Sequence, residues 1–240
     1  MGDRVGDSGD STWLEPIRKA NGGLRLIAHL SSTDLRDYHA SVAPLVRRIE
    51  RALGSRSFAN RARARGAGPP TVALEPWSIP RGRFHRAAAS LAARSSASAI
   101  ADVRECYESI HDDVLDRRLR GLGASPRDIR PLRRILDRLH EHGIRGLPIG
   151  PEPSATLADA VLGRVDRALE GARVRHLRWV DDVWMFAANE RSAAAAMRVL
   201  EDALADVSLS PAAEKTRFVD RDAMAECVRS ERPSPAGARL

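Results

Sequence analysis

The sequence contains little of several features, and their scarcity limits the classes of protein to which the chain can belong. It has only two cysteines, Cys106 and Cys227, in 240 residues, so neither a disulfide framework nor a cysteine zinc site is expected. No apolar run approaches the roughly 18 residues of a membrane span, and the opening residues lack the apolar stretch of a secretory signal. We therefore expect a cytoplasmic protein with no membrane partner.

Lysine is almost absent from a chain that is otherwise basic. Lys19 and Lys215 are the only lysines among 39 basic residues, and the formal net charge is +7. A basic surface attracts polyanions such as nucleic acids. The chain is also rich in alanine, so a genome-wide bias towards arginine and alanine accounts for the same charge. Charge alone leaves nucleic-acid binding open, but it makes each lysine conspicuous.

Two polar stretches enclose the part of the chain that is expected to fold. With 43% hydrophobic residues the chain can bury a substantial core, as one large domain or two small ones. Residues 1–12 are polar, glycine-rich and without periodicity, so we expect a disordered tail there. Prolines and a glycine near the end predict a C-terminal tail over residues 221–240.

Hydrophobic spacing predicts the elements between these tails. Apolar residues at steps of three or four indicate helices at residues 32–54, 112–122, 126–143, 154–170 and 190–206, with a weaker, alanine-rich helix at 84–94. Apolar and alternating stretches indicate strands at residues 24–30, 98–103 and 215–220, and the proline- and glycine-rich segment 146–154 is a loop. An antiparallel sheet with helices packed on one face accommodates this order, so the predicted fold class is α+β.

Two adjacent aspartates, Asp181 and Asp182, interrupt an otherwise apolar run at residues 178–186. The β-branched and aromatic residues on both sides predict two short strands, with the pair at or near the tip of a tight hairpin. Carboxylates held together against a core repel each other, and they are costly unless a cation or a proton neutralises them. Asp102 ends the predicted strand 98–103 and can lie beside this hairpin, although a lone aspartate there is also an ordinary capping or turn residue.

Three converging carboxylates would suit one kind of metal ion. Hard oxygen ligands with open coordination positions favour Mg²⁺, which keeps waters and binds nucleotide phosphates. Two such ions, about 4 Å apart, activate an attacking hydroxyl and stabilise the leaving oxygen of a phosphoryl transfer. In a basic protein this cluster predicts a nucleotidyl transferase or a nuclease, and geometry alone leaves these two tied.

Four sequence blocks flank these acids in a fixed order. Residues 102–110 read DVRECYESI, residues 146–154 read GLPIGPEPS, residues 179–182 read WVDD and residues 215–216 read KT. Block by block they resemble the palm motifs of reverse transcriptases, particularly the bacterial retron, group II intron and abortive-infection or defence-associated enzymes. Each block alone is weak, but four in order argue against chance similarity. The resemblance covers residues 22 to 220 and is firmest from residue 98 onward.

The resemblance implies a polymerase architecture. Residues 13–97 correspond to a mostly helical fingers region, and residues 98–220 correspond to the palm. Only 25 residues follow Lys215 (240 − 215 = 25), too few for the helical thumb that grips the template-primer duplex. The thumb is therefore expected to be absent, and a partner protein, a structured RNA or a homo-oligomer would supply the missing grip.

The family's catalytic roles carry over to four positions of this chain. Asp102 and Asp181 match the principal ligands of two Mg²⁺ ions, and Asp182 matches the acid that supports the cluster. The alternative is a degenerate palm that binds no metal. Lys215 matches the lysine that neutralises or protonates the pyrophosphate leaving group, where a cation opposes the developing charge. A solvated loop lysine is the alternative there.

The resemblance also implies nucleotide-binding residues. Tyr107 matches the steric gate whose ring excludes a 2′-hydroxyl and so favours deoxynucleotides, although it also fits an ordinary buried aromatic residue. Gly146, Pro148 and Gly150 would let the backbone approach the incoming nucleotide and the templating base. Arg25 is a candidate contact to the triphosphate from the fingers, but it is one of 37 arginines (39 − 2 = 37).

Two positions depart from the family pattern. Cys106 replaces the first aromatic residue after Asp102, and we expect it to be a small buried residue without a redox role. Ile149 stands where many reverse transcriptases have glutamine, which removes a polar contact to the nucleotide and leaves fidelity and sugar discrimination undetermined.

The leading hypothesis is an RNA-directed DNA polymerase that takes an RNA template and dNTPs and yields DNA, in a phage-defence or retron-like setting. Untemplated or protein-primed DNA synthesis is a second hypothesis, which a missing thumb would tolerate. A non-catalytic nucleic-acid-binding palm module is the third. The presence of all three acids favours catalysis over this last reading.

Overall fold

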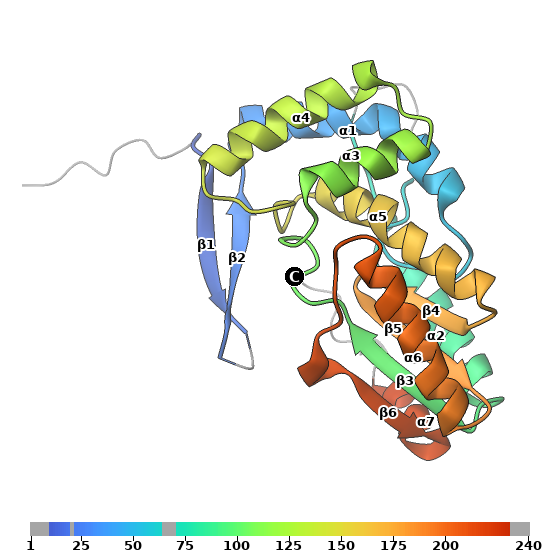
Figure 1. Cartoon of the computed structure of the whole chain (residues 1–240). Helices are drawn as coiled ribbons and strands as arrows, with labels where there is room; N and C mark the ends of the chain where they lie inside the picture. Colours follow the sequence, from blue (N-terminus) through green and yellow to red (C-terminus); the bar gives the residue numbers. More distant parts are fainter. Residues whose placement is uncertain (1–9, 20–21, 64–70, 231–240) are drawn as a thin grey trace, which may run out of the picture.

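The structure of the chain, a computed structural model, describes residues 10–19, 22–63 and 71–230. Strands and helices are mixed, and the predicted α+β class is confirmed (Figure 1). The elements in chain order are β1 (Trp13–Arg18), β2 (Leu24–His29), α1 (Ser32–Ala52), α2 (Ser78–Ala92), β3 (Ala97–Asp102), α3 (Asp112–Gly121), α4 (Pro126–Glu141), α5 (Glu152–Gly171), β4 (Arg175–Trp179), β5 (Asp182–Ala187), α6 (Glu190–Ala205), the 3₁₀ helix η1 (Ala213–Lys215), β6 (Arg217–Asp220) and α7 (Arg221–Ser230).

The larger of the two sheets has four antiparallel strands in the order β4-β5-β3-β6. β3 lies between β5 and β6, and its pairing with β5 runs from Ala97 opposite Ala187 to Asp102 opposite Asp182. β4 and β5 form the predicted hairpin. Asp181 follows Asp102 by 79 residues in the sequence (181 − 102 = 79). The pairing of β5 with β3 nevertheless brings the tip of the hairpin beside the end of β3.

An earlier part of the chain covers the outer edge of β4. The Arg178 N–H donates to the Arg56 carbonyl at 2.8 Å, and the Phe58 N–H donates to the Arg178 carbonyl at 3.1 Å. Ser57 thereby forms an isolated parallel bridge with Arg178. The segment after α1 is therefore joined to the sheet by backbone hydrogen bonds, which satisfy groups that an edge strand would otherwise expose.

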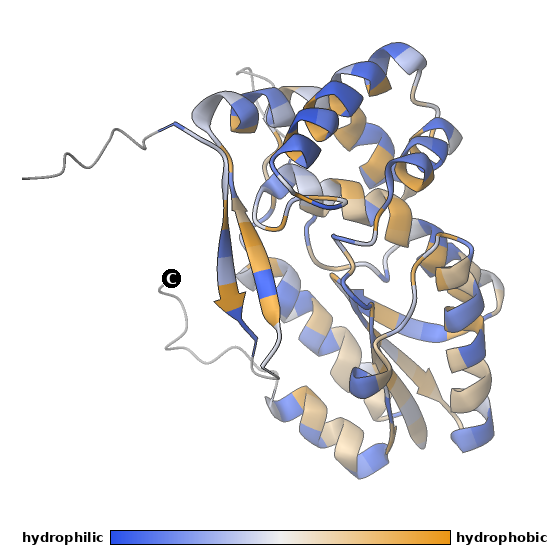
Figure 2. Ribbon diagram, turned by 60° about the vertical axis from the view of Figure 1, so that its left-hand side comes forward, coloured by the Kyte–Doolittle hydropathy of each residue, from blue (hydrophilic) through white to orange (hydrophobic). Residues whose placement is uncertain are grey.

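Helices cover both faces of this sheet. Successive side chains of a strand point to opposite faces, and β3 is buried on both, as its unbroken run of small and apolar residues predicts. α5 and α6 lie on one face, as predicted, but α2 and α7 pack on the other, where the sequence predicted no helical layer. In Figure 2 the middle of this sheet shows apolar colours between these helices, whereas β4, with the sequence RHLRW, is largely hydrophilic. The second face is built from Phe84, Ala88, Ala92, Ile100, Leu177, Trp184, Phe186, Met224 and Val228.

The upper part of the molecule is a helical layer of α1, α3, α4 and α5. α4 begins with a capping box, in which the Ser125 side chain accepts from the Asp128 N–H and Asp128 accepts from the Ser125 N–H. Its buried stripe is the predicted one of Ile129, Leu132, Ile135, Leu136 and Leu139. Arg138 joins α4 to α1 because its Nε donates to Asp34 Oδ1 at 2.8 Å.

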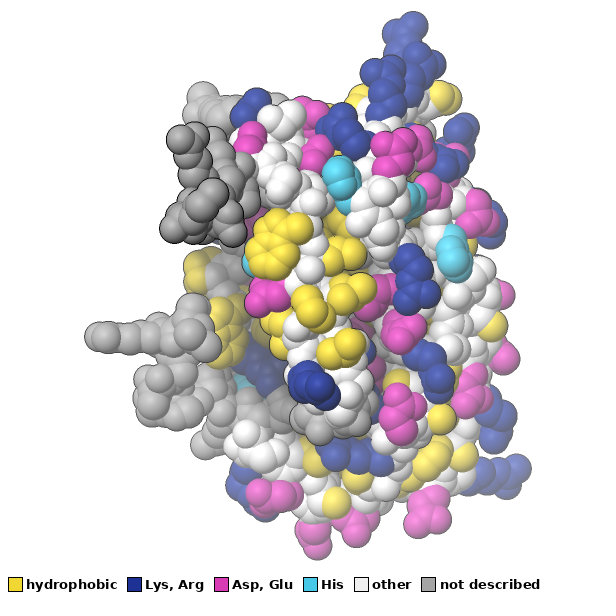
Figure 3. Space-filling view, turned by 90° about the vertical axis from the view of Figure 1, so that its left-hand side faces the viewer, with side chains coloured by type: hydrophobic (Ala, Val, Ile, Leu, Met, Phe, Trp, Pro, Cys, Tyr) yellow, Lys and Arg dark blue, Asp and Glu magenta, His cyan; other side chains and the backbone are white. Residues whose placement is uncertain are grey.

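The strands β1 and β2 form a separate antiparallel ribbon beside this layer. The sequence predicted β2 but not β1. Trp13, Ile17, Leu24 and Leu26 of the ribbon are exposed, and Figure 3, which views the molecule from this side, shows hydrophobic side chains gathered along it. The Ala28 N–H donates to the Ile149 carbonyl at 2.9 Å, which ties the ribbon to the loop before α5.

Two predicted boundaries need correction. α2 begins at Ser78, before the predicted residue 84, because Pro80 lies in the first turn, where a proline N–H is not needed. Residues 221–230 were expected in the C-terminal tail but form α7, whose Met224 and Val228 are buried. The rest of that tail, residues 231–240, and residues 1–9 of the N-terminal one lie outside the described residues. Within the described part of the chain, no helix is long and apolar enough to cross a membrane.

Candidate active site

The pairing of β3 with β5 brings the predicted acids to one end of the sheet. Asp102 and Asp182 are directly opposite in the register, and side chains opposite each other in an antiparallel pair lie on the same face. Trp179 also pairs with Asp182, so Val180 and Asp181 form the two-residue turn of the hairpin. The Val103 N–H donates to the Asp181 carbonyl at 3.1 Å, which fixes the turn beside the end of β3.

A cleft of about 310 Å³ opens over these acids. It brings together most of the side chains that the sequence singled out, from the ribbon, the end of β3, the β4–β5 hairpin and η1. Its lining comprises Lys19, Arg25, Asp102, Val103, Glu105, Cys106, Tyr107, Glu108, Ile149, Trp179, Val180, Asp181, Asp182 and Lys215.

Lys215 reaches the acids from η1. The Ala212 N–H donates to the Asp102 carbonyl at 2.7 Å, and the Lys215 and Thr216 N–H groups both donate to the Ala212 carbonyl at 3.0 Å. The chain is thereby held so that Lys215 Nζ donates to Asp102 Oδ2 at 2.7 Å. This hydrogen bond, with the charge of Asp102, raises the pKa of Lys215. The lysine is therefore a cation attached to the site rather than a remote loop residue.

The carboxylates leave the cleft with an excess of negative charge. Five acidic side chains line it (Asp102, Glu105, Glu108, Asp181 and Asp182), against Lys19, Arg25 and Lys215 as cations. Burial and then the neighbouring charge of Asp102 raise the pKa of Asp181. A raised pKa means that the ionised form lacks full compensation, which a divalent cation would provide. The donor set, aspartate oxygens at one open end of a sheet, fits Mg²⁺.

Tyr107 lies at the cleft wall and also packs against the main core. The loop that carries it is held by Gly146. Gly146 has a φ of +57°, and a Cβ there would lie 2.5 Å from the Tyr107 carbonyl oxygen and 2.7 Å from that of Glu108. The Leu147 N–H donates to the Tyr107 carbonyl at 2.9 Å. Only glycine permits this approach of two backbones.

The other predicted residues of the 146–154 loop lie further from the acids. Pro148 is buried, and Gly150, with a φ of +127°, faces the Ala28 carbonyl of β2. Of this loop only Ile149 lines the cleft. The structure thus places Gly146 against the loop after β3 and Gly150 against β2, and a direct approach of Gly146, Pro148 and Gly150 to a nucleotide stays a prediction.

The sequence left some cleft residues unassigned. Lys19, Glu105 and Glu108 line the cleft, but none of them was predicted as a site residue. Lys19 carried a usable signal because it is one of only two lysines in the chain. Glu105 has a φ of +42°, a strained conformation for this residue type that sequence spacing does not reveal.

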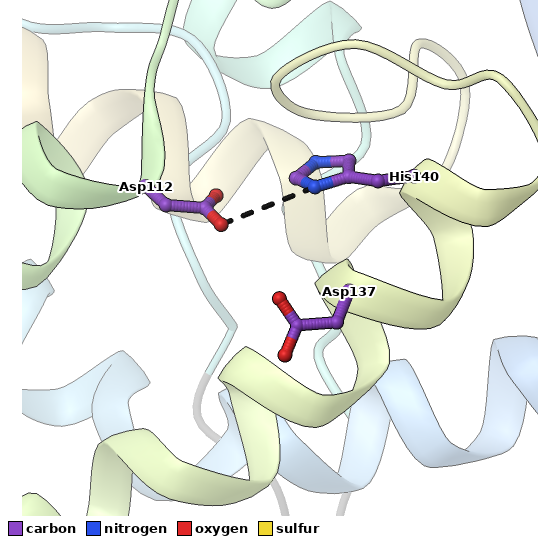
Figure 4. A group of neighbouring side chains, drawn as sticks. All are labelled: Asp112, Asp137 and His140. Carbon is purple, nitrogen blue, oxygen red and sulfur yellow. Dashed lines mark ion pairs between the residues drawn. The ribbon is translucent and has the colours of Figure 1, made fainter.

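A second group of metal-ligating residues lies outside the cleft, on α3 and α4 (Figure 4). Asp112, Asp137 and His140 place one ligand atom each within 4.8 Å of one another. His140 Nδ1 is 3.9 Å from Asp112 Oδ2, and Arg133 Nη1 donates to the same Asp112 oxygen at 3.4 Å. Since Asp137 is exposed and Asp112 already pairs with a cation, we interpret this group as a surface ion network.

Comparison with known proteins decides the family. The family model described as reverse transcriptase (RNA-dependent DNA polymerase) matches residues 17–227. The chain belongs to the reverse transcriptase family. Enzymes of this family are RNA-directed DNA polymerases and therefore nucleotidyltransferases. The predicted family membership is thus confirmed, and the match extends upstream of residue 98 into the region that was identified less specifically.

Solved structures of telomerases share the fold. Apo telomerase from Candida tropicalis, truncated from its C-terminal domain, has a TM-score of 0.51 at 13% identity, over 90% of this chain and 51% of that one. The Candida tropicalis and Candida albicans telomerases with a fragment of telomeric RNA both score 0.54, at 14% and 13% identity, over 91% and 88% of this chain. This chain covers 42% of each of these two. No curated protein matches the chain.

Proposed function

We propose that the chain catalyses RNA-directed DNA synthesis in the cleft over Asp102, Asp181 and Asp182. The observation that carries the proposal is the convergence of these three acids with Lys215 and Tyr107 from three separate segments of a reverse transcriptase fold. Each of these five residues also belongs to a sequence block that resembles the family's palm motifs.

The roles follow from position. Asp102 and Asp181 would hold two Mg²⁺ ions, with Asp182 beside them, and bound Mg²⁺ supplies charge neutralisation for the phosphates and lowers the pKa of the attacking hydroxyl. Lys215 holds a proton at Nζ, 2.7 Å from Asp102, and would donate it to the pyrophosphate oxygen. Arg25, on the ribbon side of the cleft, would bind the triphosphate.

Tyr107 would set the sugar specificity. Its ring lies in the cleft wall and its backbone is held between the core and Gly146, so the ring can exclude a 2′-hydroxyl sterically. Deoxynucleotides are therefore the proposed substrates. The proposed subgroup is a bacterial retron-like, group II intron-like or defence-associated enzyme. The residue pattern of the motifs alone supports this assignment. Neighbouring genes, such as a non-coding RNA or a toxin-like partner, would test that assignment.

A primer-extension assay tests the activity. The purified protein is incubated with Mg²⁺ and labelled dNTPs on a primed RNA, on a primed DNA and without a template. The control is the double variant Asp181→Asn, Asp182→Asn, which is nearly isosteric and lacks both charges of the hairpin.

Each result has a defined meaning. Mg²⁺-dependent extension on primed RNA that the control lacks supports the proposal. Product without a template supports untemplated or protein-primed synthesis in the same site. If the wild type incorporates no nucleotide under any condition and matches the control, the catalytic proposal is wrong, and a nucleic-acid-binding palm remains.

A further inference from the structure

Arg178 of β4 is a fully buried arginine three positions before Asp181. All five N–H donors of its guanidinium are used. Nε and Nη2 each donate to the Asp166 carboxylate at 2.9 Å. Nη1 donates to Asp159 Oδ1 at 2.8 Å and to the Val180 carbonyl at 2.7 Å, and Nη2 also donates to Ser57 Oγ at 2.8 Å. A planar fork with five donors meets these four groups at once, which the three donors of lysine do not.

The hydrogen bond to Val180 reaches the turn that carries the catalytic acid. Val180 has a φ of +55°, a conformation that a β-branched residue rarely adopts because its side chain crowds the backbone. Val180 is the first residue of the turn and Asp181 is the second. The Val180 carbonyl belongs to the peptide that joins them. The guanidinium therefore fixes the orientation of the peptide bond between Val180 and Asp181, and with it the position of the Asp181 backbone.

The network behind the turn is rigid because it is buried and charged. Asp159 and Asp166 lie on α5 and are buried, and Ser57 comes from the segment that covers the edge of β4. Burial alone would raise the pKa of Asp166, but the charge and hydrogen bonds of Arg178, together with those of His176, outweigh burial and lower that pKa. Asp166 is thus an anion that binds the guanidinium on the side away from the turn. The guanidinium is held by α5 and by the segment at the edge of β4, and it in turn holds the Val180 carbonyl.

We infer that Arg178 is a positioning residue that holds the Val180–Asp181 turn in its strained conformation, so that the Asp181 carboxylate faces Asp102 ready for a divalent cation. This inference rests on the proposed function. It differs from a purely structural role because the network would still join α5, Ser57 and β4 without the bond to Val180.

The test uses Arg178→Lys, which keeps the buried positive charge beside Asp166 but lacks the planar guanidinium with its five N–H donors. Loss of a residue that orients a metal ligand typically costs 10–100-fold in metal affinity or activity. We expect Mn²⁺ affinity, measured by electron paramagnetic resonance without nucleotide, to fall roughly 10-fold or more. We expect kcat for dNTP incorporation to fall by a similar factor, with the KM for dNTP nearly unchanged. Ser57→Ala is the matched control, because it removes an Arg178 partner distant from the turn and should leave Mn²⁺ affinity unchanged.

A rescue separates positioning from general damage. Glycine adopts a positive φ without strain. Val180→Gly in the Arg178→Lys background should therefore restore a substantial part of the Mn²⁺ affinity that Arg178→Lys alone loses. If Arg178→Lys does not fold, Arg178→Met with Asp166→Asn removes both charges of the main pair and still lacks the donor to Val180, so the same loss of Mn²⁺ affinity is expected.

The outcomes are distinguishable. If Arg178→Lys keeps the Mn²⁺ affinity and kcat of the wild type, or loses only thermal stability, the positioning role is wrong and the proposed function stands. If the wild type itself neither binds Mn²⁺ nor incorporates dNTPs, the proposed function is wrong, and the inference falls with it.

Discussion

Lys215 and Asp102 are 113 residues apart in the sequence, yet the lysine ammonium donates a 2.7 Å hydrogen bond to the aspartate carboxylate. The contact depends on the pairing of β3 with β6 and on η1, which begins where the Ala212 N–H is bound to the Asp102 carbonyl. A cation held this way stays in place when the aspartate takes up other ligands, because its backbone is fixed independently.

Lys215→Ala is expected to lower the rate of nucleotide incorporation. Loss of a general acid or of one charge-stabilising group costs roughly 10²–10³-fold in kcat. Lys215→Arg should retain more activity since it keeps the charge, and Arg217→Ala, on the neighbouring strand, serves as the control. Rapid-quench measurement of single-turnover incorporation checks this. Equal rates for Lys215→Ala and the control would show that the lysine takes no part in the chemistry.

Tyr107→Ala is expected to increase incorporation of ribonucleotides relative to deoxynucleotides. Tyr107→Phe should leave this ratio unchanged because the ring, not the hydroxyl, excludes the 2′-hydroxyl. Competition of each NTP with the matching dNTP on one primed template measures the ratio. A ratio that Tyr107→Ala does not alter would assign the tyrosine to core packing only.

Gly146→Ala is expected to destabilise the fold far more than Gly143→Ala. Both glycines have positive φ, but a Cβ at Gly143 meets nothing within 4 Å, whereas one at Gly146 collides with two carbonyl oxygens. The unfavourable φ costs about 1 kcal/mol at either site, and the collision adds about 2 kcal/mol at Gly146. Urea unfolding of the two variants measures the difference, and equal losses would contradict the close approach of the two backbones.

Asp159 makes the stability of the protein depend on pH. Burial raises the pKa of its carboxyl from the ordinary 3.8 to about 6, so the folded state binds a proton that the unfolded state has released. Its contribution to the free energy of unfolding therefore decreases as pH rises through this interval. Asp159→Asn keeps an acceptor for Arg178 and should remove that decrease, which chemical unfolding at several pH values would detect.

Asp166→Asn provides the contrast to that variant. Asp166 binds the buried Arg178 through two nitrogens, so its neutralisation breaks this pair, leaves Asp159 to compensate the arginine charge and should cost about 3–5 kcal/mol. If Asp166→Asn and Asp159→Asn had the same effect at neutral pH, the two acids would share the arginine charge equally, contrary to the geometry.

Local patterns made much of the fold predictable. The helical spacing of α4 and α6 and the apolar run around Asp181 each depend on neighbours in the chain, and each element appears where it was expected. β1 was missed because its residues lack alternation, and Pro16 argues against a strand except at an edge. α7 was missed because the prolines beyond it suggested a tail that begins earlier.

The candidate site was predictable for a different reason. Asp102 and the aspartate pair were singled out by the charge that they place beside apolar strands, Tyr107 and Lys215 were named through motif resemblance, and the structure brings all of them to one cleft with Arg25. Lys19, Glu105 and Glu108 were not named because they reach the cleft through tertiary structure and belong to none of the assigned motif positions. The buried partners of Arg178 were likewise hidden, since Ser57, Asp159 and Asp166 are far apart in the sequence or face inward only once α5 packs.

The segment at residues 56–58 makes the two expected domains inseparable. It hydrogen-bonds along the outer edge of β4, and α2, which also precedes residue 98, covers one face of the same sheet. A fragment that started at residue 98 would expose both an open strand edge and the apolar side chains around Trp184. Such a fragment would be expected to aggregate by edge-to-edge pairing, so the polymerase sheet is soluble only together with the chain that precedes it.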